Sequence, residues 1–97
     1  MATNEQLISL DQHLGLETLP ELAKRFSTTL ASGDSLALDG SAVRSIDGAA
    51  MQLLLAMLRT ARKEGIPCRW QEVAPPLVDA AALLGVSDEL LLAEAEQ

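Results

Sequence analysis

The chain is poor in the side chains that carry out chemistry. Its 97 residues include one phenylalanine, one tryptophan and no tyrosine, with a single histidine and a single cysteine. One cysteine excludes both an intramolecular disulfide and a multi-cysteine metal site, and two isolated aromatic side chains make no stacking platform for bases. The six glycines are scattered, so the chain lacks the glycine-rich loop that brings a backbone close to a pyrophosphate. We therefore expect no bound cofactor and no enzymatic activity.

Positive charge is scarce as well, with seven Lys and Arg residues against fourteen Asp and Glu residues. The net charge of −7 repels phosphate backbones and anionic lipid headgroups, so nucleic-acid binding is not expected. The longest strongly apolar stretch, Gly48 to Leu58, is well short of the roughly 20 residues that span a bilayer. The first residues show no basic segment followed by an apolar one. Together with the lone cysteine, these features favour a cytoplasmic protein without membrane insertion.

What the chain does have is an alternation of strand-like and helix-like segments. Hydrophobic residues make up 48% of it. Their spacing predicts strands at 7–10, 35–39, 42–46 and 67–73, and helices at 18–31, 48–64, 75–85 and 87–94. This order is typical of an α/β fold, here a small mixed sheet of about four strands with helices packed against it. A chain of this length has room for one modest core, so we expect a single domain over residues 1–97.

Two of the predicted helices begin at recognisable capping residues. Asp47 precedes the helix at 48–64, and aspartate is a preferred N-cap residue because its carboxylate accepts a hydrogen bond from the first turn. This helix is expected to end near Gly65. Thr18 and Glu21 have the spacing of a capping box at the start of the helix at 18–31.

The helix at 48–64 is apolar over more of its circumference than one sheet contact requires. The face expected to pack on the sheet consists of Met51, Leu54, Leu55 and Leu58. Four further residues widen the apolar arc to about 200°, against the roughly 100° of one packed face: Ala50, Leu53, Met57 and Ala61. Either the helix at 18–31 covers the excess or a partner does, and Leu53 and Met57 are the residues to test.

The two potentially reactive side chains have ordinary interpretations. His13 is the only histidine, and no nucleophile motif or second metal ligand accompanies it, so we expect a surface or loop histidine. Cys68 lies in an apolar strand beside Trp70, which favours an inert core thiol because a reactive thiol needs an electropositive, accessible setting.

Several segments, in this order and spacing, resemble a STAS domain. They are Leu36–Asp39, Val43–Asp47 with the apolar helix after it, Lys63–Gly65, the strand through Trp70, Val73–Leu77 and Leu83–Val86. STAS domains include bacterial anti-sigma-factor antagonists, small subunits of lipid ABC transporters and tails of anion transporters. The resemblance covers the chain from about Leu7 to Leu92 and implies a bacterial, protein-binding module. The residues around Arg44 and Trp70 also resemble standalone STAS proteins found beside chemotaxis-type kinases.

The same resemblance points to a missing phosphorylation site. In the antagonist branch, the Asp at the strand end is followed by Ser, then by a phosphorylated Ser or Thr, then by Gly. This chain has Asp47-Gly48-Ala49-Ala50, so Ala49 stands at the position of the phosphate acceptor. A phosphate there would repel a docked partner, and alanine cannot carry one. The resemblance implies docking that is constitutive, or controlled by the partner's state, or controlled by modification elsewhere, for example at Ser45 or Ser41.

We therefore expect a non-catalytic signalling module that docks a protein through the Asp47 turn and the start of the helix at 48–64. The predicted partner-binding residues are Ser45, Asp47, Gly48, Ala49, Ala50, Gln52, Leu53, Ala56 and Met57. The expected partner is a kinase or an anti-sigma-type regulator. The alternative is the ATPase of a lipid ABC transporter, although STAS subunits of that kind generally keep a hydroxyl residue after the Asp. A small-ligand sensor is a third alternative, and a monomer or a weak homodimer is compatible with each.

Overall fold

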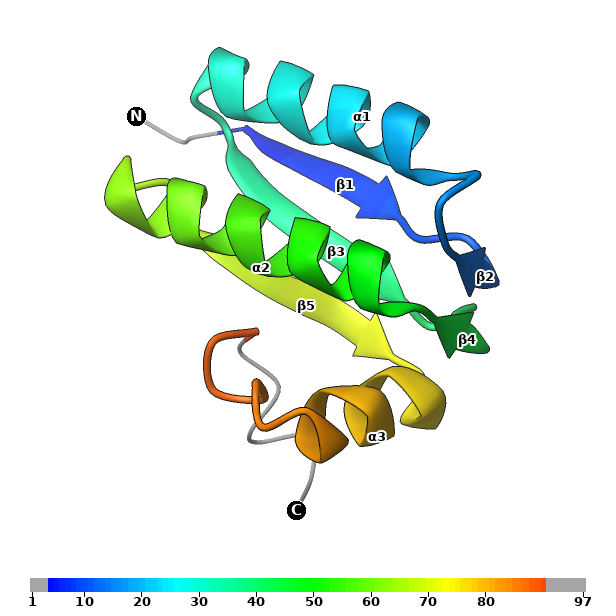
Figure 1. Ribbon diagram of the computed structural model, residues 1–97. Helices are drawn as coiled ribbons and strands as arrows, with labels where there is room; N and C mark the ends of the chain where they lie inside the picture. Colours follow the sequence, from blue (N-terminus) through cyan, green and yellow to red (C-terminus); the bar gives the residue numbers. More distant parts are fainter. Residues whose placement is uncertain (1–3, 91–97) are drawn as a thin grey trace.

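A computed structural model describes residues 4–90, in which three helices alternate with five short strands (Figure 1). The strands are β1 (Glu5–Ser9), β2 (His13–Leu14), β3 (Ser35–Gly40), β4 (Ser45–Ile46) and β5 (Cys68–Val73). The helices are α1 (Leu19–Ser32), α2 (Gly48–Lys63) and α3 (Pro75–Leu83).

The main sheet consists of β1, β3 and β5 in that order, and both of its pairings are parallel. Parallel neighbours need a crossover connection, and α1 and α2 supply the two crossovers. Both helices lie side by side over the same face of the sheet (Figure 1). The expected α/β fold is therefore confirmed, although the strand pairings within residues 4–90 are parallel rather than mixed.

A second, two-stranded pair lies beyond the carboxyl ends of β1 and β3. In it, β2 and β4 run parallel, with His13 opposite Ser45 and Leu14 opposite Ile46. Figure 1 shows this pair next to the ends at which α1 and α2 begin. The strand expected over residues 42–46 is shorter than predicted, because the chain turns directly after β3, where the N–H of Val43 donates to the carbonyl of Gly40 at 3.3 Å.

The core lies between the main sheet and the two covering helices, and it is almost entirely aliphatic. The strands contribute Ile8, Leu36 and Leu38, which are at most 3% exposed. The helices contribute Leu22 and Phe26 from α1 and Met51, Leu54, Leu55 and Leu58 from α2. Burial of each such side chain contributes roughly 1.5–3 kcal/mol. This packing holds α2 on the sheet and so fixes the position of its N-terminus relative to the strands.

The two predicted helix starts differ in outcome. The cap at Asp47 is confirmed, since its Oδ1 accepts a hydrogen bond of 2.9 Å from the N–H of Ala50. The capping box at Thr18 is wrong, because the Thr18 side chain makes no hydrogen bond to the first turn of α1. Its hydroxyl instead donates to the carbonyl of Gly15 at 3.0 Å and accepts from the N–H of Gly15 at 3.2 Å. The Thr18 side chain therefore closes the turn that precedes α1.

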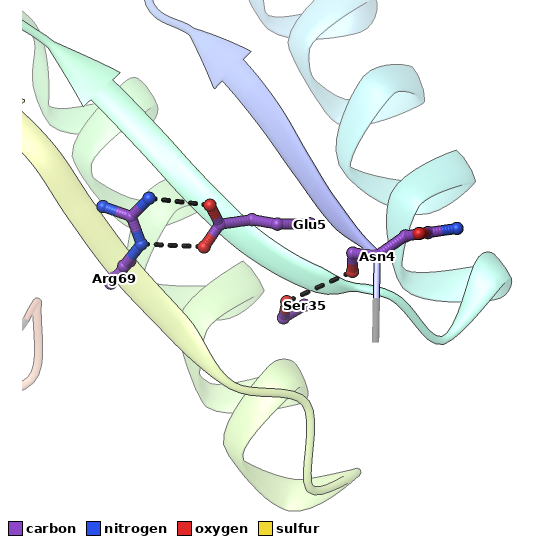
Figure 2. Close-up of polar contacts among 4 residues, drawn as sticks. All are labelled: Asn4, Glu5, Ser35 and Arg69. Carbon is purple, nitrogen blue, oxygen red and sulfur yellow. Dashed lines mark hydrogen bonds and ion pairs between the residues drawn. The ribbon is translucent and has the colours of Figure 1, made fainter. Parts of the chain in front are cut away.

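The other face of the main sheet carries an ion pair that crosses the central strand. Arg69 on β5 donates two hydrogen bonds of 2.7 Å to the carboxylate of Glu5 on β1, passing over β3 (Figure 2). Beside it, the hydroxyl of Ser35 donates to the carbonyl of Asn4 at 3.2 Å (Figure 2). The hydrogen bond from Arg69, and then its charge, lower the pKa of the Glu5 carboxylate. Both side chains are exposed, so the pair ties the outer strands together without carrying much of the stability.

The chain after β5 packs beside that strand and α2. Leu77 of α3 is fully buried, and the indole N–H of Trp70 donates to the carbonyl of Leu90 at 2.6 Å. Arg59 of α2 forms an ion pair with Glu89 at 2.6 Å. The helix expected at 87–94 extends outside the described residues, and its described part, 87–90, forms turns.

Candidate functional site

Asp47 is held in place at the junction between β4 and α2. Its N–H donates to the carbonyl of Leu14 in β2 at 2.9 Å, and its carbonyl accepts from the N–H of Met51 at 3.0 Å. Its Oδ1 caps the helix through Ala50, as described above. The backbone and one carboxylate oxygen are thus fixed by the fold, while the side chain as a whole is exposed.

The other carboxylate oxygen of Asp47 points toward Gly15, in the segment between β2 and α1. A Cβ at position 15 would lie 3.0 Å from Oδ2 of Asp47, which is closer than packed atoms normally approach. The positive φ angles among the described glycines belong to Gly33, Gly65 and Gly85. Gly15 is therefore not needed for an unusual backbone conformation here, and what it provides is room for the Asp47 carboxylate.

A groove of about 450 Å³ opens at this junction. One wall is the segment from β2 to the start of α1, and the other is β4 with Asp47. Its lining residues are His13, Leu14, Gly15, Leu16, Glu17, Thr18, Ser45, Ile46 and Asp47. Leu16 stands out in this set because its side chain is 72% exposed.

Ser45 and His13 both line this groove and contact each other. The Ser45 hydroxyl and Nδ1 of His13 are 2.8 Å apart, within hydrogen-bond distance, and both residues are exposed. His13 lies in β2 rather than in a loop, and its position on the surface agrees with the expectation. The Ser45 hydroxyl therefore has a partner within the chain, on the opposite residue of the β2–β4 pair.

The first turns of α2 present a small, uncharged surface. Gly48, Ala49, Gln52 and Ala56 are exposed. Ala50 requires a correction: its side chain is 0% exposed, so it belongs to the core and cannot contact a partner. The accessible residues among those predicted to bind a partner are Ser45, Asp47, Gly48, Ala49, Gln52 and Ala56, with Leu53 and Met57 along their edge, and we refer to this candidate set as the docking surface.

Leu53 and Met57 are neither sealed in the core nor freely exposed. Both are partly buried and pack against the core cluster. Helical spacing places them on the flank of α2 away from Arg59, the residue that pairs with Glu89. That flank is on the side of α1, which contacts α2. The neighbouring helix thus covers part of the wide apolar arc and leaves the rest accessible.

Sequence reasoning missed the half of the site that comes from the β2–α1 segment. Gly15, Leu16 and Glu17 line the groove, but the contact between Gly15 and Asp47 joins parts of the chain far apart in sequence. The one available signal in the sequence was Leu16, an apolar residue between a glycine and a glutamate in a segment expected to be a loop.

The remaining chemistry of residues 4–90 is sparse. Within that range no group of three or more His, Cys, Asp or Glu side chains is placed to hold a metal ion. Burial raises the pKa of the Cys68 thiol, which keeps it protonated and unreactive. None of the helices in residues 4–90 has the length and apolar character to cross a membrane.

Comparison with known proteins assigns the family. Residues 1–93 match the model of the family described as Mlab, STAS domain, so the chain belongs to the STAS domain family. Domains of this family form a general anti-sigma-factor-antagonist-like module, are generally non-catalytic and typically bind other proteins. No curated protein gives a significant match to the chain. The resemblance found in the sequence is thereby confirmed.

Proposed function

We propose that this protein is a non-catalytic regulatory module of bacterial signalling, located in the cytoplasm, that docks another protein through the docking surface defined above. The partner is a kinase or an anti-sigma-type regulator. The supporting observation is the conjunction of a fixed, exposed Asp47 with an uncharged first turn of α2, in a chain from a family that typically binds proteins. Small side chains at Gly48 and Ala49 allow a partner backbone to approach the helix closely.

The regulatory part of the proposal concerns Ala49, where phosphorylation would otherwise release the partner. The residue is exposed at the second position of α2, where a phosphate would stand in the path of a docking partner. Because alanine cannot be phosphorylated, docking is not released at this position. Control then resides in the partner's own state or in a modification at another residue, and the simplest form of the proposal is constitutive docking.

Site-specific photo-crosslinking in the native host tests the proposal. A photoreactive amino acid replaces Gln52, which is exposed on the docking surface, and in a matched control replaces Gln71, which is exposed on β5. We expect one protein to crosslink at position 52 and not at position 71, and mass spectrometry identifies it as a kinase or an anti-sigma factor. Equal crosslinking at both positions, or none at position 52, would contradict the proposal.

A second candidate function is that of the STAS subunit of a lipid ABC transporter. The observation that favours it is the description of the matching family, which names Mlab rather than an anti-sigma-factor antagonist. The same surface of α2 would then hold an ATPase subunit. The crosslinking experiment separates the two candidates, because recovery of an ABC ATPase at position 52 favours the transporter.

A further inference from the structure

The groove beside Asp47 shares Ser45 and Asp47 with the docking surface and adds the segment from β2 to α1, which that surface does not include. We propose that it receives a basic side chain of the protein partner, arginine or lysine, while Leu16 packs against an apolar side chain next to that residue. This inference rests on the proposed docking function and adds the chemistry that the partner must offer.

The acceptor for the basic side chain is Oδ2 of Asp47. Within residues 4–90 the hydrogen bonds of the Asp47 carboxylate use Oδ1, and Oδ2 is turned toward Gly15. Because position 15 has no Cβ, the carboxylate fits against Gly15, and Asp47 is exposed and lines the groove. A carboxylate that is already oriented by a helix cap binds a cation with little further loss of side-chain entropy, and an ionised acceptor makes the stronger class of hydrogen bond.

The charges around the groove are complementary to a cationic side chain. Asp47 and Glu17 are both exposed and line it, and among the described residues neither a lysine nor an arginine does. Arg44, the nearest basic residue in sequence, lines a different hollow with Pro75 and Pro76. The net charge of −7 adds a long-range attraction for a basic partner.

A second copy of this chain is a poorer occupant than a basic partner. A symmetric dimer through the groove would place Asp47 and Glu17 of one protomer against the same carboxylates of the other, and opposed like charges are unfavourable at an interface. Leu16 also points to a heterologous contact. A leucine that is 72% exposed at the rim of a groove is suited to anchoring in an apolar recess of another protein.

Two substitutions remove the proposed interactions without disturbing the fold. Asp47→Asn keeps an oxygen that can cap α2 while removing the charge, since asparagine is as good an N-cap as aspartate. Leu16→Ala removes an exposed side chain. Their matched controls are Asp39→Asn, since the Asp39 carboxylate also accepts from a nearby backbone N–H, that of Ser41 at 2.9 Å, and Leu84→Ala, which alters another exposed leucine.

The first measurement needs no identified partner. The dipeptide acetyl-Leu-Arg-amide is titrated into the labelled protein, and backbone amide shifts are followed by NMR. We expect shifts concentrated at residues 15–18 and 47–50, at least about threefold smaller with acetyl-Leu-citrulline-amide or with the Asp47→Asn protein, because both remove the ionic contribution. Acetyl-Leu-Lys-amide distinguishes arginine from lysine. Shifts that are equal with citrulline, or absent from these residues, would overturn the inference.

The second measurement separates this inference from the proposed function. With the protein that crosslinks at position 52, we expect Asp47→Asn and Leu16→Ala each to weaken binding about tenfold, as loss of a charged or anchoring contact does, while Asp39→Asn and Leu84→Ala leave it unchanged. If Ala49→Glu abolishes binding but Asp47→Asn and Leu16→Ala do not, the docking function stands and the groove inference is wrong. If none of the three changes weakens binding, both are wrong.

Discussion

Substitution of Ala49 by glutamate separates the stability of this protein from its docking. Ala49 is exposed at the second residue of α2, and no acidic residue lies in the first turn of that helix. A carboxylate there gains about 0.3–1 kcal/mol from the helix dipole and loses a few tenths of a kcal/mol in helix propensity relative to alanine. The free energy of unfolding should therefore change by less than about 0.8 kcal/mol, which corresponds to less than about 6 °C in Tm for a chain of this size.

Docking should respond quite differently to the same change. A glutamate at position 49 puts an unpaired negative charge into the proposed interface, and removing an uncompensated charge from water costs several kcal/mol. We expect the affinity for the crosslinked partner to fall by at least about 30-fold, which is about 2 kcal/mol.

Thermal melts and isothermal titration calorimetry on the same preparations measure the two effects. Ala82→Glu adds the same charge at an exposed alanine of α3 and should leave the affinity unchanged. Full affinity of the Ala49→Glu protein would refute the docking surface. A fall in Tm of more than about 8 °C would refute the account of position 49 as an unobstructed helix start.

Three further predictions follow from particular contacts. Gly40→Ala places a Cβ 3.0 Å from Cζ3 of Trp70 and 3.1 Å from Cδ2 of Leu77, so it should lower the free energy of unfolding by about 1–3 kcal/mol; an unchanged urea midpoint would show that the neighbours can move aside. Glu5→Gln should destabilise the protein more at pH 7 than at pH 3. Pairing with Arg69 holds the folded-state pKa of Glu5 below its unfolded value, so the contribution is present above the unfolded pKa and is lost as the pH falls through the folded one. An equal effect at both pH values would contradict this assignment. Finally, incubation with the cognate kinase and ATP should phosphorylate an Ala49→Ser protein and leave the natural protein unmodified by intact-mass analysis, whereas phosphate on Ser45 would overturn constitutive docking.

The parts of this structure that sequence predicted well are those determined by neighbours along the chain. Helix α2 follows from the spacing of its apolar residues. Its cap follows from Asp47, whose carboxylate accepts a hydrogen bond from the N–H three residues further along the chain. Strand β5 likewise follows from its flanking Pro67 and its alternation. The family also follows from the order of such segments.

The parts that sequence predicted poorly depend on contacts between distant segments. The capping box at Thr18 failed because the hydroxyl is engaged by Gly15 instead, and local spacing cannot decide between those partners. The strand at 42–46 was overestimated because only two of its residues meet β2. The groove was missed for the same reason, since Gly15 and Asp47 come together only after β2 and β4 have paired.

Hydrogen exchange on the complex with the crosslinked partner tests the central claim most directly. The account predicts that binding slows amide exchange in residues 45–57 and in the groove wall at 13–18, while β1 and β5, the outer strands of the main sheet, exchange as in the free protein. Protection confined to another surface, such as the exposed Leu83 and Leu84 at the end of α3, with no change at 45–57, would contradict it.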